Sequence, residues 1–442
     1  MNDHTSSPSA DMPEGLGATG DKRERTIRPD KETRGLLSEL HGEDSVSEDA
    51  LAVLLARAVW SRLAEPGDAA AGLLIGTLGP LRALDLIGEP HATKASGRAL
   101  SAAPDTAGSL SATQLSAGLK RWRPRLDRAA TVRDLRSAVA TEMTLLTPES
   151  SLWPAQFDDL GRHAPLALWV RGKADTLASP SLAVVGARAC TGYGSHVTAD
   201  LTAEAGAAGF SIVSGAAYGI DAVAHRTALA TGTTTIAVLA GGADRAYPVS
   251  HDQMLATIAV EGAICSELVP GAAPTRWRFL QRNRIIASLS KAVLVTEAGT
   301  RSGTLNTAGH AAELGRSLGA VPGPVTSGAS AGCHRLIREY GATLVTNGAE
   351  LRELLGVETP DPLLSADDQQ YDPTGRSPSL HLRILDALPL QGSRSAADVS
   401  VRAGVSVEDA TETLAELELL KYVRRDETAD DEAVRWLLLR RE

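Results

Sequence analysis

The sequence has few cysteines, few aromatic residues and no excess of positive charge, and each shortage excludes a class of protein. Cys190, Cys265 and Cys333 lie far apart and lack the paired spacing of a zinc site, so we expect buried, reduced thiols and no bound metal. The formal net charge of −10 excludes a protein that is basic throughout. Any site for a polyanion therefore has to be a local patch.

Long apolar segments are also absent from the sequence. No run reaches the roughly 18 apolar residues that a membrane-spanning helix needs. The polar N-terminus, residues 1–7, has no apolar core of the kind found in secretory signals. We therefore expect a cytoplasmic protein without membrane contacts.

Changes in composition predict five parts along the chain. The polar residues 1–34 are expected to be a disordered tail, because they cannot bury enough apolar area to offset ordering. Residues 35–145 carry apolar side chains at helical spacing and predict a small helical domain with a loose insertion near 91–118. A domain at 150–355 and a proline-containing linker at 356–378 follow. Residues 379–442 predict three helices and a β-ribbon, the layout of a winged helix.

Short apolar runs alternate with alanine-rich helical segments in the domain at 150–355. Most of these runs are apolar on both faces, as strands of a covered parallel sheet are. The rhythm predicts an α/β fold with an extended, Rossmann-like, doubly wound and mostly parallel sheet. The predicted strands are Leu182–Val185, Ser211–Val213, Thr235–Leu239, Ala263–Cys265, Ala292–Thr296 and Gly319–Val321.

Arginine and aromatic residues gather in the loops that follow these strands, where open parallel sheets bind their ligands. Arginine offers a fork for phosphate, and aromatic rings offer faces on which unpaired bases stack. The loops therefore predict a site for single-stranded nucleic acid. Alternatively, the glycines there only form tight turns, the aromatic rings cover the sheet edge, and the arginines pair with nearby acids. The enriched residues are Arg188, Arg245, Arg276, Arg278, Arg282, Arg284 and Arg301, with Tyr193, Tyr218, Tyr247, Trp277 and Phe279.

Several common sites are disfavoured by the same loops. Gly186 to Gly194 does not match the dinucleotide-binding glycine pattern, and the second strand ends in Ser214-Gly215 rather than an acid. The phosphate-binding loop of nucleoside triphosphatases does not occur. Nor does Ser214 lie in the G-x-S-x-G turn that presents the nucleophilic serine in α/β-hydrolases. His310 and Glu313 share a helix face but lack a second pair of metal ligands. We therefore expect no cofactor, no metal and no catalytic residue.

The loops carry ordered motifs that resemble the DNA-processing protein A family of bacterial natural transformation. The resemblance covers about 150–355 in order, from an entry segment within Trp153–Gly172 to an exit segment within Gly332–Ala342. Tyr218 departs from the family pattern, which usually has arginine there. The matching segments are Val184–Arg188, Ser214–Asp221 with Ala224-His225, Ala237–Pro248, Arg282–Ala287, Glu297–Thr304 and Val321–Gly323.

The resemblance implies a non-enzymatic protein that binds single-stranded DNA without sequence preference. It also implies a homodimer that protects incoming DNA and loads a RecA-type recombinase onto the strand, in transformation or recombination. The residues expected at the DNA are Arg188, Gly215, Tyr218, Gly219, Phe279, Arg282, Asn283, Arg284, Ser302 and Gly303.

Two other functions remain open from the residues. The family's fold is similar to that of phosphoribohydrolases acting on nucleoside monophosphates, so Glu297 or Asp221 could act on an N-glycosidic bond while Arg188 or Arg301 holds the phosphate. The loops could instead contact a protein.

The C-terminal domain differs from a DNA reader in its charge. Acidic side chains would repel phosphate, so we expect a protein-contact or autoinhibitory role there. These acids are Glu408, Asp409, Glu412, Glu416 and Glu418 on the expected recognition helix, and Asp426, Glu427, Asp430, Asp431 and Glu432 in the expected wing.

Overall fold

The computed structural model describes residues 28–41, 47–88, 110–300, 302–357, 380–389, 392–419, 421–426 and 434–439. Contacts divide the chain into two compact units, Met1–Thr359 and Pro360–Glu442. The predicted tail, loose insertion and linker, and most of the predicted wing, lie largely outside the described residues, as does Arg301.

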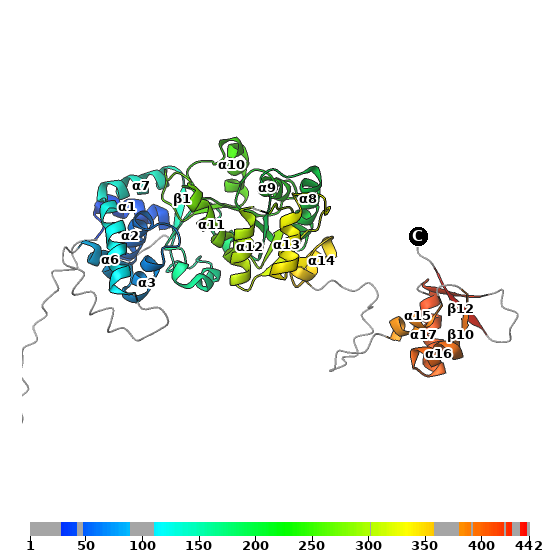
Figure 1. Ribbon diagram of the computed structural model, residues 1–442. Coiled ribbons are helices and arrows are strands. Elements are labelled where there is room, and N and C mark those ends of the chain that lie inside the picture. Colours follow the sequence, from blue (N-terminus) through cyan, green and yellow to red (C-terminus); the bar gives the residue numbers. More distant parts are fainter. Residues whose placement is uncertain are drawn as a thin grey trace, which may run out of the picture. The chain divides into compact units, whose positions relative to one another are not determined.

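The first unit begins with a helical region that packs beside strand β1 at one end of the sheet (Figure 1). Side-chain caps fix several helix starts: Ser47 and Asp68 accept hydrogen bonds from amides of the following turn, and Ser111 forms a capping box with Gln114. Trp60 and Trp122 pack edge to face in its core, with ring centroids 5.3 Å apart. The helices are α1 (Lys31–His41), α2 (Glu48–Leu63), α3 (Ala69–Leu78), α4 (Pro80–Gly88), α6 (Ala112–Trp122), the 3-10 turn η1 (Arg123–Arg125) and α7 (Arg128–Ala140).

Among the described residues, no single helix is long and apolar enough to cross a membrane. Helices α3 and α4 together have the length and apolar composition of a membrane-spanning helix, but the chain bends by 112° between them. Their apolar side chains contribute Ala71, Leu74 and Leu84 to the core of the helical region.

The described residues of the first unit form a nine-stranded sheet in the order β1-β2-β6-β5-β4-β3-β7-β8-β9. All pairs from β6 to β9 are parallel, whereas β1 pairs with β2, and β2 with β6, in antiparallel fashion. The predicted Rossmann-like, mostly parallel fold is therefore confirmed. The strands are β1 (Met143–Leu146), β2 (Leu168–Gly172), β3 (Ser181–Val185), β4 (Ser211–Ser214), β5 (Thr235–Val238), β6 (Ala263–Ser266), β7 (Ala292–Val295), β8 (Ser317–Ala320) and β9 (Thr343–Leu344).

Helices cover both faces of the sheet, which explains why its strands are apolar throughout. On β3, Ala183 and Val185 face a core shared with α11 and α12, whereas Leu182 and Val184 face α8, α9 and α14. The helices of this part are α8 (Gly192–Ala207), α9 (Ile220–Ala230), α10 (Asp252–Glu261), α11 (Arg276–Leu289), α12 (Thr304–Glu313), α13 (Ala331–Tyr340) and α14 (Gly348–Leu354), with 3-10 turns at Ala155–His163, Ala174–Ala178 and Val249–His251.

The second unit has its own core and a small sheet. Ile384, Leu414 and Trp436 lie in that core, and the described strands pair antiparallel in the order β10-β12-β11. The three predicted helices and the ribbon are confirmed, while their assignment as a winged helix stays a prediction. The elements are α15 (Leu380–Ala387), β10 (Arg394–Ser395), α16 (Ala396–Ala403), α17 (Val407–Leu419), β11 (Val423–Arg425) and β12 (Arg435–Leu438).

Candidate functional site

A cleft of about 930 Å³ opens at the carboxyl ends of the central strands. Strand β3 lies between β4 and β7, so the connections after β3 and β7 run in opposite directions and leave a crevice. The starts of α11 and α12 form its walls. Six of the predicted site residues line it, namely Arg188, Phe279, Arg282, Asn283, Ser302 and Gly303.

Arg188 is an exposed cation of the cleft. Its guanidinium carbon lies 5.1 Å from the centroid of the Phe279 ring, within cation–π distance. Tyr247 also packs against Phe279, with ring centroids 5.6 Å apart. In the described part of the chain, Arg188 forms no ion pair. The aromatic ring therefore holds an arginine that can still bind an anion.

Arg282 is also in the cleft wall, but it is only 6% exposed and most of its donors bond internally. Its Nη1 donates to the carbonyls of Gly215, at 2.7 Å, and Val238, while Nε donates to Asn283. Burial lowers the pKa of Arg282 to about 10, so the group stays protonated at neutral pH. Arg282 thus ties the ends of β4 and β5 together and brings positive charge to the floor of the cleft.

Gly215 is adjacent to Arg282 rather than on the cleft surface. A β-carbon at position 215 would lie 2.4 Å from the Arg282 guanidinium, so a side chain there would displace it. Asp221 accepts hydrogen bonds from the amides of Gly215, at 3.1 Å, and Ala217, at 3.4 Å. Burial raises the pKa of the Asp221 carboxyl, and the charge of Arg282 opposes this shift.

The amino end of α12 forms the opposite wall of the cleft. Ser302 Oγ accepts from the Thr304 amide at 3.2 Å, and the Thr304 hydroxyl donates to the Gly186 carbonyl at 2.9 Å. The side-chain amide of Asn283 donates to Asn306 at 3.2 Å, joining α11 to α12. This arrangement aims a helix amino terminus, with its partial positive charge, at the cleft.

Four predicted site residues lie outside the cleft lining, namely Gly215, Tyr218, Gly219 and Arg284. Gly219, with φ of +77°, lets α9 begin against the loop that carries Arg188, because a β-carbon there would lie 2.2 Å from the Ala187 carbonyl oxygen. The Tyr218 hydroxyl accepts from Ser250 at 3.0 Å, and its ring packs against His251. Gly219 therefore positions Arg188, and Tyr218 ties its loop to the segment that follows Pro248.

Arg284 lies within the protein, on the side of α11 away from the cleft. It is 3% exposed and pairs with Glu267 at 2.5 Å. The sequence places Arg284 two residues from Arg282 but cannot show this partner. The geometry therefore gives Arg284 a structural role within the protein.

Other cleft residues were not among the predicted contacts. Tyr247 and Arg276 line the cleft and are exposed, and Thr300 and Thr304 join them near α12. The signal for the first two was present, because both belong to the enrichment of arginine and aromatic residues in the strand-end loops. Glu297, by contrast, is buried and accepts from the amide and hydroxyl of Thr191, both at 2.8 Å.

Comparisons with known proteins agree on one family. The family model described as DNA recombination-mediator protein A matches residues 144–356. A putative DNA processing protein DprA of Mycobacterium tuberculosis is 38% identical over 401 residues, which cover 87% of this chain and 94% of that protein. Protein Smf of Escherichia coli is 37% identical over 287 residues, covering 63% of this chain and 74% of that protein. The crystal structure of DNA processing protein A from Streptococcus pneumoniae superposes with a TM-score of 0.53 and 30% identity, covering 67% of this chain and 95% of that one.

Proposed function

Because this chain belongs to the DNA recombination-mediator protein A family, we propose that its cleft binds single-stranded DNA without sequence preference. The observation that carries the proposal is the pairing of Arg188 with Phe279, opposite the amino terminus of α12. Arg188 and the helix terminus suit successive phosphates, and the aromatic faces suit unpaired bases.

Rim residues support a strand rather than a small ligand. Tyr247, which lines the cleft, and Trp277, which follows the cleft residue Arg276 in sequence, are 49% and 57% exposed. Trp277 thus adds an exposed aromatic side chain outside the cleft lining. Guanidinium groups and aromatic faces contact phosphate and any base alike, which is why we propose binding without sequence preference.

The carboxylates of the site favour a binding role over N-glycosidic hydrolysis. Both oxygens of Glu297 accept hydrogen bonds from Thr191, and Asp221 accepts from two backbone amides of its own loop. Both acids therefore already serve the fold of the loops. We propose that the cleft holds DNA and breaks no bond.

Family membership also supports a finer proposal. We propose that the protein protects incoming strands and loads a RecA-type recombinase onto them as a homodimer. Assembly of recombinase filaments on DNA coated with single-strand-binding protein measures loading, and light scattering measures the oligomeric state.

Salt should weaken single-strand binding steeply. Each phosphate neutralised by arginine releases counterions, with a slope of about −0.7 in log affinity against log salt per contact on a single strand. We expect the full chain to bind oligothymidylate more tightly than a duplex of equal length at both about 50 and about 200 mM salt, the range over which such losses are large. Equal affinity for the two forms, or no salt dependence, would contradict the proposal.

Removal of residues 379–442 should leave single-strand affinity unchanged or raise it. In the described residues, Glu408, Asp409, Glu412 and Glu416 are exposed on α17, and such charge repels phosphate. Oligothymidylate binding by the truncated and full chains makes the comparison, and recombinase loading is the second readout. A large loss of DNA affinity on truncation would show that the second unit binds the strand.

A further inference from the structure

A basic segment crosses the helical region, although the whole chain is acidic. Residues 120–128 contain five basic side chains and one acid, in a protein with a net charge of −10. The segment runs from the end of α6 through η1 to the start of α7. The side chains of Arg121, Arg125 and Arg128 are 52%, 43% and 69% exposed.

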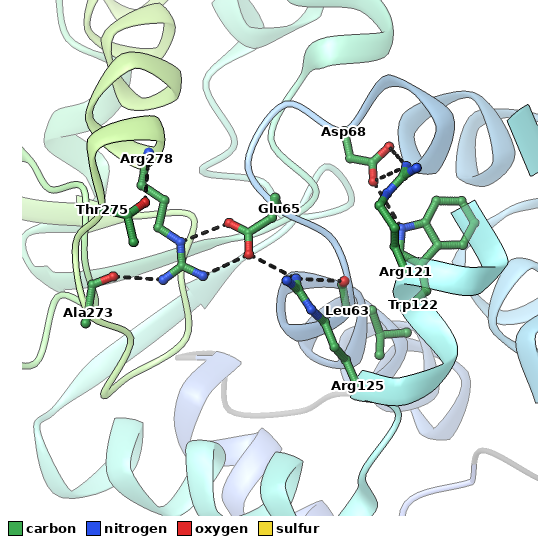
Figure 2. Close-up of polar contacts among 9 residues, drawn as sticks. All are labelled: Leu63, Glu65, Asp68, Arg121, Trp122, Arg125, Ala273, Thr275 and Arg278. Carbon is green, nitrogen blue, oxygen red and sulfur yellow. Dashed lines mark hydrogen bonds and ion pairs between the residues drawn. The ribbon is translucent and has the colours of Figure 1, made fainter. Parts of the chain in front are cut away.

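Glu65 connects this segment to α11, the helix that forms one wall of the cleft (Figure 2). Arg125 Nη1 lies 3.0 Å from Glu65 Oε1. Arg278 binds the same carboxylate from the other side, through Nε and Nη2, each at 2.9 Å. The hydrogen bond from Arg278 lowers the pKa of Glu65, so the carboxylate stays charged at neutral pH. Two guanidinium groups on one carboxylate leave a net positive charge at this junction.

Arg278 also connects its ion pair with Glu65 to the residues that line the cleft. Its Nη1 donates to the Ala273 carbonyl at 2.8 Å, and the next residues, Pro274, Thr275 and Arg276, line the cleft. Figure 2 shows Ala273, Thr275 and Arg278 together on one side of Glu65, and Arg125 on its other side. Arg121 and Arg128 pair with Asp68 and Asp30, so the excess positive charge lies where Arg125 and Arg278 share Glu65. A strand that leaves the cleft over Arg276 would meet that charge first.

We propose that Arg125 and its neighbours in residues 120–128 form a second contact surface for the same single strand, which extends from the cleft onto the helical region. This inference rests on the proposed single-strand binding by the cleft. Glu65 then lowers the affinity of this surface for single-stranded DNA, because its negative charge repels the phosphates next to Arg125 and Arg278.

A purely structural role for these contacts makes a different prediction. If Glu65 only joins the helical region to α11, then loss of Glu65 and loss of Arg125 disturb the same joint and affect DNA binding in the same direction. If the strand does extend onto the helical region, the two substitutions change DNA affinity in opposite directions. They do so only for strands long enough to reach that region. The dependence on strand length and the direction of the change in affinity therefore distinguish the two explanations.

The test uses the full chain with oligothymidylates of about 6 and about 30 nucleotides, the first near the lower end of the usual single-strand site sizes of about 4–16 nucleotides and the second well above them. Arg125→Ala should weaken binding of the long strand about fivefold at about 0.1 M salt and reduce the salt slope by about 0.7, the share of one phosphate contact. Binding of the short strand should not change. Glu65→Gln should tighten binding of the long strand by a similar factor and again leave the short strand unaffected.

Arg226→Ala provides the matched control, since Arg226 is exposed on α9 and does not line the cleft. The inference is overturned if Arg125→Ala changes neither strand or both equally, or if Glu65→Gln fails to tighten binding of the long strand. A wild-type chain that binds neither oligonucleotide refutes the proposed function instead. If Arg125→Ala does not fold, the Glu65→Gln result alone decides.

Discussion

Arg188→Glu should weaken binding of single-stranded DNA about 25-fold at about 0.1 M salt and reduce the salt slope by about 1.4. The estimate combines the loss of one phosphate contact with the addition of one repulsive charge, each about fivefold at that salt concentration. Stability should hardly change, because Arg188 is exposed and its contact is with the face of the Phe279 ring. Fluorescence anisotropy with labelled oligothymidylate at several salt concentrations measures both quantities.

Arg226→Glu is the control for this substitution. It changes the net charge by the same amount on an exposed face of α9, outside the cleft. We expect it to lower affinity only slightly, through the overall field of the protein. Equal losses for the two variants would place the DNA elsewhere, and an unchanged affinity for Arg188→Glu would remove Arg188 from the site.

Most of the central sheet could be predicted because its strands are buried on both faces. Such strands appear in the sequence as short continuous apolar runs, and the predicted runs overlap β3 to β8. The prediction missed β1, β2 and β9. Strand β1 begins three residues after α7 ends, and β9 has only two residues, both exposed, so neither gave a distinct run. Strand β2 pairs antiparallel on both sides and falls outside the β-α-β rhythm.

The candidate site was predictable in its location but less so in its individual contacts. Residues 275–284 contain four arginines and no acidic residue, a pattern that predicts a single basic surface. The structure separates them: Arg276 lines the cleft, whereas Arg278 binds Glu65 and Arg284 binds Glu267. Glu65 lies 213 residues from Arg278 in sequence, so no local pattern could reveal the pair.

Arg284→Ala should lower the free energy of unfolding of the first unit by about 3–5 kcal/mol, the usual effect of breaking a buried ion pair. The side chains of Arg284 and Glu267 are 3% and 9% exposed, so the substitution leaves a buried carboxylate without its cation. Urea unfolding followed by tryptophan fluorescence measures the change. A loss below about 1 kcal/mol, typical of exposed pairs, would show that water reaches this pair.

The double variant Arg284→Met with Glu267→Leu should recover most of that stability. Within the described residues, Nε and Nη1 of Arg284 are buried without hydrogen-bond partners, so the wild-type pair already carries an uncompensated desolvation cost. Apolar side chains of similar size remove that cost together with both charges. The double variant also tests the role of Arg284 in DNA binding, because it folds without the guanidinium. We expect wild-type affinity for oligothymidylate; a large loss would mean that Arg284 leaves Glu267 to bind the strand.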